Sequence, residues 1–318
     1  MYRHSRLAAI LGCAATLAMV GCSTNGSMTP SSGTSAVSDG QRAFHGSWIH
    51  AGQVVYFTPK YMATRSAAHT VVPDTQFTYF GGPVLVTPKT YLILWGYKTY
   101  GDPDNVAKLL KAYLKVEGGS GHNNIYTQYY EVVGSKTTYI TNPKKQDGGV
   151  WDDETDAVPQ YPTDAQVATE SLAGVKHFGY NANGSYIVAT PNGRNSQGFG
   201  SQWCAYHSDT FSGNDLVSYT NLPYMPNAGA NCGANFYNPA PKDETSTDEG
   251  VTIVEGHEYG ESITDPNPGT GWYNFSYGEI GDICAWNGIA NETFGKKSYT
   301  MQPMWSNANG GACVQTYQ

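Results

Sequence analysis

The sequence predicts an α+β protein: a mixed sheet with helices, followed by a loop-rich C-terminal part with disulfides. Two continuous apolar runs rich in β-forming residues, 84–86 and 91–95, predict buried strands. Apolar side chains recur at helical spacing over residues 106–116, and residues 163–178 read as a second helix. Residues 191–241 are rich in Gly, Asn and Pro, which is typical of loops.

The N-terminus predicts export. Two arginines precede an apolar run, residues 7–20, that is too short to cross a membrane comfortably but fits the apolar part of a signal peptide. The run leads into Gly21-Cys22, which resembles a bacterial lipidation site; an ordinary signal peptide cut nearby is the alternative. We expect residues 1–21 to be removed and the exported protein to be anchored through a lipid on Cys22, at the cell surface or outer membrane, or to be secreted.

The composition of residues 22–318 predicts a tether followed by one domain. Residues 22–43 are rich in Ser, Thr and Gly and predict a flexible tether. Residues 44–318 show no repeat and no convincing internal boundary, so we expect one domain there. Further strands are expected at 125–133, 137–141 and 186–189.

Charge excludes one class of partner. The chain has 18 Lys+Arg and 26 Asp+Glu, a formal net charge of −8. Nucleic-acid binding needs a clustered basic surface, which this sequence lacks. We expect membrane contact only through the lipid anchor.

Four cysteines remain beyond Cys22 in the exported part of the chain. Four cysteines in an exported protein predict two disulfides. We favour Cys204–Cys232 and Cys284–Cys313, because both pairings close short loops. A four-cysteine zinc site is the alternative, but the spacing lacks the usual paired ligands.

The most informative segment is a helix predicted from about residue 246, where Ser246 and Glu249 fit a capping box, to the prolines that follow Asp265. Within it, His257, Glu258 and Glu261 continue the apolar stripe instead of opposing it, so they face the interior. Gly256 and Gly260, one turn apart, would let another backbone approach closely.

His257-Glu258-Tyr259-Gly260-Glu261 differs by one letter from the H-E-x-x-H motif of zinc peptidases. In that motif, ligands at i and i+4 reach one Zn²⁺ and the intervening Glu is the general base. Glu261 replaces the second His, since Zn²⁺ accepts carboxylate oxygen. Asp282 and Glu279 are rival third ligands, and His207 is a weaker candidate.

Other interpretations of this segment remain open. His257 could be a hydrogen-bonded, partly buried histidine without a metal. Asp265, Asn267 and Gly269 weakly resemble a Ca²⁺ loop, although prolines interrupt it. Aromatic residues could line a carbohydrate or peptide groove or pack in the core: Trp272, Tyr273 and Trp305.

Three runs carry a family resemblance: YTNLPYMPNAGANCGANF, DEGVTIVEGHEYGESITDPNPGTGWYN and GEIGDICAW. They resemble a family of exported bacterial proteins with an H-E-x-x-E motif and a zincin-like peptidase fold. GGPVLVTPKTYLILWGY is similar to the opening of the plant EXORDIUM/phosphate-induced protein family. The resemblance covers roughly residues 79–318 and implies a secreted or surface protein.

These observations predict a surface-anchored or secreted zinc-dependent hydrolase, with a metallopeptidase-like domain over residues 44–318. One Zn²⁺ would be held by His257, Glu261 and Asp282 or Glu279, and Glu258 would be the general base. The substrate would be a peptide, a protein or a cell-wall glycan. The alternative is a non-catalytic cell-wall or glycan-binding protein with a structural metal.

Overall fold

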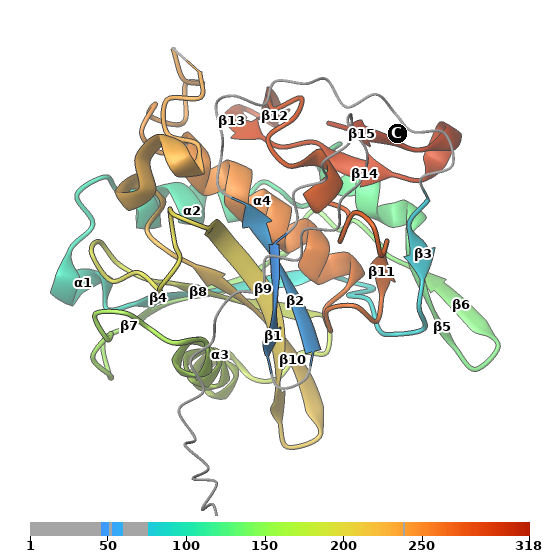
Figure 1. Ribbon diagram of the computed structural model, residues 1–318, viewed down its shortest axis with the longest axis horizontal. Coiled ribbons are helices and arrows are strands. Elements are labelled where there is room, and N and C mark those ends of the chain that lie inside the picture. The colour runs from blue at the N-terminus through green and yellow to red at the C-terminus, as the bar shows by residue number, and fades with distance from the viewer. Residues whose placement is uncertain (1–45, 51–52, 60–75, 238) are drawn as a thin grey trace, which may run out of the picture.

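The computed structural model describes residues 46–50, 53–59, 76–237 and 239–318; the predicted signal peptide and tether lie outside them. Its centre is a seven-stranded mixed sheet in the order β1-β2-β9-β10-β8-β4-β7 (Figure 1). β10, β8, β4 and β7 are parallel, whereas β9, β2 and β1 continue the sheet by antiparallel pairing. The strands are β1 (Gly46–His50), β2 (Gln53–Pro59), β4 (Lys89–Trp95), β7 (Asp147–Asp153), β8 (Gly184–Ala189), β9 (Trp203–Ser212) and β10 (Asp215–Leu222).

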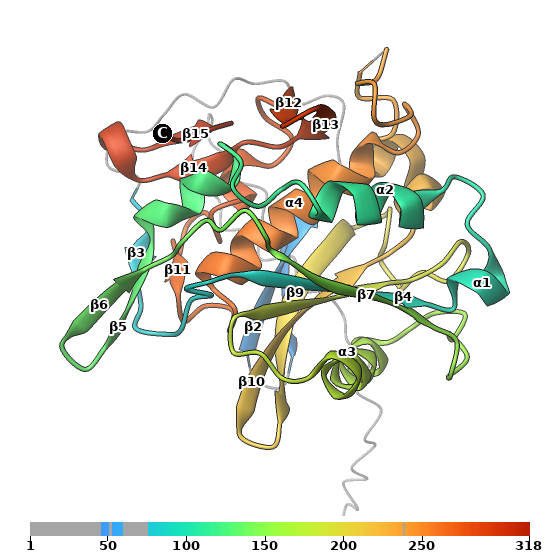
Figure 2. The same cartoon turned by 180° about the vertical axis from the view of Figure 1, so that it is seen from behind.

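Helices cover both faces of this sheet (Figures 1 and 2). α2 (Val106–Leu114) and α4 (Glu249–Thr264) lie on one face, and α3 (Asp164–Phe178) lies on the other. α1 (Tyr97–Tyr100) directly follows β4. No helix in the described ranges has the length and hydrophobicity needed to span a bilayer.

Short elements complete the fold, and those near the C-terminus pack against the side of α4 that faces away from the sheet. Short strands form two-stranded pairs: β3 (Thr78–Tyr79) with β11 (Trp272–Tyr273), β5 (Tyr130–Val133) with β6 (Lys136–Tyr139), β12 (Ala290–Phe294) with β13 (Lys297–Met301), and β14 (Met304–Ser306) with β15 (Ala312–Val314). The 3₁₀ helices are η1 (Asn123–Gln128), η2 (Met225–Cys232), η3 (Asp282–Cys284) and η4 (Ala308–Gly310).

The predicted α+β class and mixed sheet are confirmed, and so are several individual elements. The run 91–95 lies within β4, and both long predicted helices form. α3 begins with the reciprocal cap in which Thr163 and Gln166 satisfy each other's backbone N–H groups.

Other predicted elements are wrong. Residues 84–86 form no strand; Val84 and Leu85 are buried and Val86 is partly buried, so burial rather than pairing explains their apolar character. Residues 125–128 belong to the helix η1, and a strand begins only at Tyr130. The stretch 191–241, expected to be loops, contains β9 and β10; consecutive polar residues such as 207–210 break the alternation of apolar and polar side chains that marks a strand.

Both favoured disulfides are present. Cys204, on β9, is bonded to Cys232 at the end of η2, and Cys284, on η3, is bonded to Cys313 on β15. The first bond fixes strand β9 to η2. The second holds the segment that contains Asp282 against the C-terminal strands.

α4 is buried along its whole length because the sheet covers one side and the C-terminal elements cover the other. The helix begins at Glu249, and its N-cap Asp248 makes no capping bond, so the capping box predicted from Ser246 is wrong. Gly256 and Gly260 do permit close approach, but of side chains and not of a backbone. A β-carbon at Gly256 would lie 2.5 Å from a Met301 methyl group, and one at Gly260 would lie 2.5 Å from that of Met304.

Candidate metal centre

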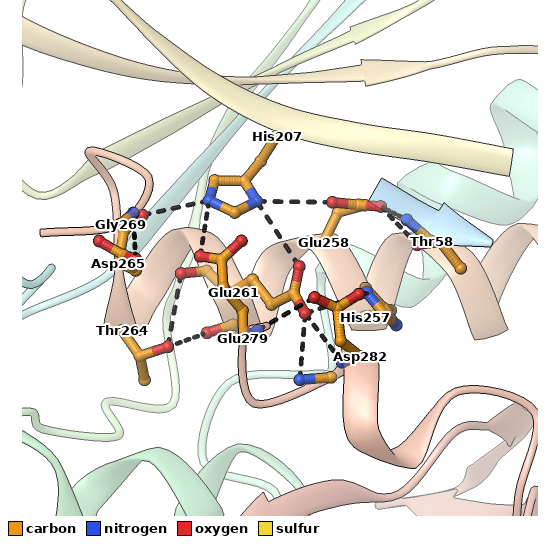
Figure 3. A network of polar contacts seen from close by, with 12 residues as sticks. Thr58, His207, His257, Glu258, Glu261, Thr264, Asp265, Gly269, Glu279 and Asp282 are labelled. Atoms are coloured by element: carbon orange, nitrogen blue, oxygen red, sulfur yellow. Dashed lines mark hydrogen bonds and ion pairs between the residues drawn. The ribbon is translucent and has the colours of Figure 1, made fainter. Parts of the chain in front are cut away.

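The polar side chains in the middle of α4 converge with residues from three other parts of the chain. His207 reaches down from β9 toward Glu258 and Glu261, and η3 brings Asp282 to the other side of the helix (Figure 3). β9 positions His207 because successive residues point to opposite faces, so Tyr206 packs toward α3 and His207 toward α4. Each of these polar side chains is 0–4% exposed.

The first group of possible metal ligands is His257, Glu261 and Asp282. His257 Nε2 lies 3.1 Å from Glu261 Oε1 and 3.8 Å from Asp282 Oδ1. The three ligand atoms lie within 4.8 Å of one another, which is the spacing of donors around a single small cation. The structure thus brings Asp282, one of the two rival third ligands, beside the predicted His and Glu.

The second group is His207, Glu258 and Glu261. His207 Nδ1 lies 3.5 Å from Glu258 Oε2 and 3.7 Å from Glu261 Oε2. This group also fits within 4.8 Å. Glu261 belongs to both groups and is therefore the centre of the cluster.

Neighbouring backbone and side-chain groups orient these ligands. Glu261 Oε1 accepts hydrogen bonds of 3.1 Å from the N–H groups of Gly281 and Asp282. The Gln302 amide nitrogen donates to the Gly281 carbonyl and lies 2.9 Å from His257 Nδ1, which fixes the imidazole ring. A β-carbon at residue 281 would lie 2.8 Å from Glu261 Oε1, so a larger residue there would displace this ligand.

Glu279 and Asp265 lie beside His207 but outside the two groups. His207 Nε2 is 3.1 Å from the Asp265 carbonyl oxygen and 3.3 Å from Glu279 Oε1, so this nitrogen donates and Nδ1 faces the cluster. The Asp265 carboxylate accepts N–H bonds from Gly269, Thr270 and Gly271. These bonds close the turn after α4, so Asp265 has a structural role where a Ca²⁺ loop was one interpretation.

Burial and repulsion from neighbouring acids raise the pKa of Asp282 and of Glu279, which indicates excess negative charge around them. Burial raises the pKa of Asp282 well above its usual value, and Glu261 raises it further. Burial also raises the pKa of Glu279 far above its usual value. Burial lowers the pKa of His257, but the carboxylates of Glu261, Glu258 and Asp282 outweigh it and raise the value to about 10.

Glu258 differs from the other acids. Its pKa is lowered in spite of burial, because His207 and His257 stabilise the carboxylate and Thr58 donates to it. Glu258 Oε1 accepts hydrogen bonds from both the backbone N–H and the hydroxyl of Thr58. Glu258 is therefore held as an ionised carboxylate, which is the form that a general base requires.

Among the described residues, histidines supply the ion-pair partners of this acidic cluster. Within the described part of the chain, no lysine or arginine forms an ion pair with it. Several of its atoms also have no hydrogen-bond partner among the described residues: His207 Nδ1, His257 Nε2, Glu258 Oε2, Glu261 Oε2, Asp282 Oδ1 and both Glu279 oxygens. An unpaired buried carboxylate costs several kcal/mol, as an order of magnitude, so the arrangement has the chemistry of a cation site.

Sequence reasoning missed two residues of this site. Thr58 and Gln302 touch Glu258 and His257 from positions 200 and 45 residues away, and no local pattern marks either of them. Of the two interpretations of Trp272, Tyr273 and Trp305, core packing is confirmed, because these side chains are 3–7% exposed.

No protein-family model, no curated protein and no solved structure matches this chain. The geometry of the cluster therefore carries the functional argument.

Proposed function

We propose that this protein is an exported, zinc-dependent hydrolase with a zincin-like arrangement, most simply a metallopeptidase. One observation carries the proposal: buried imidazole and carboxylate atoms meet around α4 without hydrogen-bond partners among the described residues. Structural carboxylates acquire partners when they are buried, whereas a metal site keeps its ligand atoms free for the cation. The two disulfides are compatible with export.

In this proposal His257, Glu261 and Asp282 hold the zinc, and Glu258 is the general base. A zinc ion in that position would polarise a carbonyl group and make a nearby water more acidic. Glu258 takes a proton from water as the water oxygen bonds to the amide carbon. The proton then passes to the amide nitrogen as the C–N bond breaks, which gives a carboxylic acid and an amine.

The choice between the two ligand groups rests on Glu258. Its Oε1 atom accepts two hydrogen bonds that hold the carboxylate in place, and its Oε2 atom has no hydrogen-bond partner among the described residues. Two carboxylates and one imidazole supply more negative charge than the more common two imidazoles and one carboxylate. We therefore expect a weaker Lewis acid and activity shifted toward higher pH.

The test combines metal analysis with hydrolysis of a labelled unfolded protein such as casein. Protein purified without chelators and offered Zn²⁺ should carry about one zinc per chain, and a chelator should abolish cleavage. His257→Ala should remove most of the zinc, whereas His207→Ala, which deletes an equally buried histidine of the other group, should keep it.

Three outcomes contradict the proposal in different ways. Absence of bound zinc refutes the metal site. Loss of zinc in His207→Ala alone assigns the metal to the second group and removes Glu258 from its role as base. Stable zinc without cleavage of peptides or amides supports a binding protein with a structural metal instead.

A further inference from the structure

The strand β2 closes the proposed active site through its residue Thr58. Thr58 is fully buried, and both its N–H and its hydroxyl donate to Glu258 Oε1. β2 also packs against α4 and η3, the two elements that carry His257, Glu261 and Asp282 (Figures 1 and 3). Through β2, the N-terminal hairpin of β1 and β2 therefore covers the cluster on the side where β2 lies next to β9.

β2 is held there as an added edge strand. Its end pairs antiparallel with the start of β9, with Thr58 opposite Ala205 and Pro59 opposite Trp203. The sheet order places β2 and β1 outside β9. Removal of this hairpin would leave β9 as the edge, with backbone N–H and C=O groups free to pair with another strand.

The described conformation is closed to a substrate. The cluster residues are 0–4% exposed, so no polypeptide can reach them while β2 is in place. Thr58 occupies Glu258 Oε1 with two donors, while Oε2 faces His207. Hydrolysis at this site requires this cover to open, and β2 is an element of the cover that binds Glu258 directly.

We propose that β2 is a built-in occupant of a peptide-binding edge, and that the substrate is an extended polypeptide that pairs with β9 in its place. This inference rests on the proposed function and names its substrate class and its regulation. Main-chain pairing with a free sheet edge binds an extended chain largely without regard to its sequence. It also places a backbone amide of the bound chain where the Thr58 N–H now meets Glu258.

The hairpin can be released by a single substitution. Thr58→Asp removes the hydroxyl donor and sets a carboxylate against Glu258, so like charges should push β2 away. Thr58→Ser keeps the hydroxyl and is the matched control. Hydrogen exchange of the β9 amides measures release independently of any activity, because pairing protects those amides.

The decisive measurement is binding of a labelled peptide with the sequence of β2, QVVYFTP, by fluorescence anisotropy. Thr58→Asp should bind this peptide at least tenfold more tightly than the wild-type protein or Thr58→Ser. The same variant should cleave casein faster, by tenfold or more, and excess peptide should suppress the gain.

The inference is overturned if Thr58→Asp shows faster exchange in β9 but no peptide binding, or if all three proteins bind the peptide equally. Should the substitution fail to release the strand, a variant lacking residues 46–59 gives the same comparison, and a folded form that ignores the peptide also overturns the inference. Peptide binding does not need zinc. Peptide binding without bound zinc therefore refutes the proposed hydrolase alone, whereas zinc-dependent cleavage without peptide binding refutes the strand exchange alone.

Discussion

Among the described residues, buried carboxylates at the two ends of α4 have hydrogen-bond partners for both oxygens, whereas two carboxylates in its middle do not. At the start of the helix, Glu249 accepts hydrogen bonds from the Tyr237 N–H and the Thr300 hydroxyl. Just past its end, Asp265 accepts three backbone N–H groups. In the middle, Glu258 and Glu261 each keep one oxygen without a hydrogen-bond partner among the described residues.

This difference distinguishes carboxylates that are buried to hold the fold from carboxylates that are buried to bind a ligand. N–H donors lower the cost of burying a carboxylate, although burial still raises the pKa of Glu249 and brings that of Asp265 to about 6. An equally buried carboxylate with a free oxygen is costly unless something else binds it. Glu249, Glu258 and Glu261 lie on one helix and are all 0% exposed, so the comparison is free of differences in burial.

The largest effect is expected at Glu261, which belongs to both ligand groups. Glu261→Gln should abolish zinc binding and with it hydrolysis, because neither group retains three charged or imidazole ligands. Glu249→Gln is the matched control from the satisfied end of the helix and should keep its zinc. The zinc content of the two purified variants is measured by mass spectrometry. Equal zinc contents would show that the carboxylates in the middle of α4 do not differ from those at its ends in metal binding.

Glu258→Gln should have the next largest effect, and on activity alone. The amide keeps the shape of the side chain and leaves His257, Glu261 and Asp282 in place, so zinc content should match the wild-type protein. Loss of the general base should slow hydrolysis by ~10²–10⁴-fold. The measurement is kcat with a peptide substrate beside the zinc content; full activity would show that another group takes the proton.

The contrast within α4 was only half visible in the sequence. The i, i+4 spacing of His257 and Glu261 predicts a shared helix face, because a helix repeats every 3.6 residues. The pairing of cysteines followed from short loop lengths, and both bonds formed as expected. Local patterns of this kind need no knowledge of the rest of the fold.

The remaining partners come from long-range packing, which periodicity does not report. Thr58 reaches Glu258 only because β2 joins β9, and that pairing lies in a stretch the sequence presents as loops. The sequence also left Asp282 and Glu279 equivalent. The turn at Gly281 decides between them, since it presents Asp282 to His257 while Glu279 faces His207.

A smaller effect should separate these two acids. Asp282→Asn should weaken zinc binding by more than the ~10–100-fold that a supporting residue costs, because it removes a direct ligand. Glu279→Gln keeps a hydrogen-bond acceptor near His207 Nε2 and should stay within that range. Competition with a fluorescent zinc chelator measures both affinities. If Glu279→Gln weakened zinc binding more than Asp282→Asn, the zinc would be assigned a position nearer to His207.

The smallest effect concerns Glu255 on α4. Like Glu258 and Glu261 it has carboxylate oxygen without a hydrogen-bond partner among the described residues, but it lies outside both ligand groups. Both its oxygens lack hydrogen-bond partners within the described ranges, and burial, with Glu258 nearby, raises its pKa to about 8. Glu255 is then protonated in the folded protein over a range where it is ionised in the unfolded chain. The folded protein should therefore lose stability as the pH rises from the unfolded pKa, about 4.3, to about 8.

Glu255→Gln removes that titration, because the amide stays neutral at every pH. Relative to the wild-type protein, the variant should gain stability as the pH rises and level off above pH 8, by ~1.4 kcal/mol for each unit between the unfolded and folded pKa values of Glu255. Urea unfolding of both proteins at several pH values measures the difference, and groups that the two proteins share cancel from it. Parallel pH profiles would show that Glu255 is ionised in the fold. An ionised Glu255 would then need a positive charge bound near it, separate from the two ligand groups that contain Glu261.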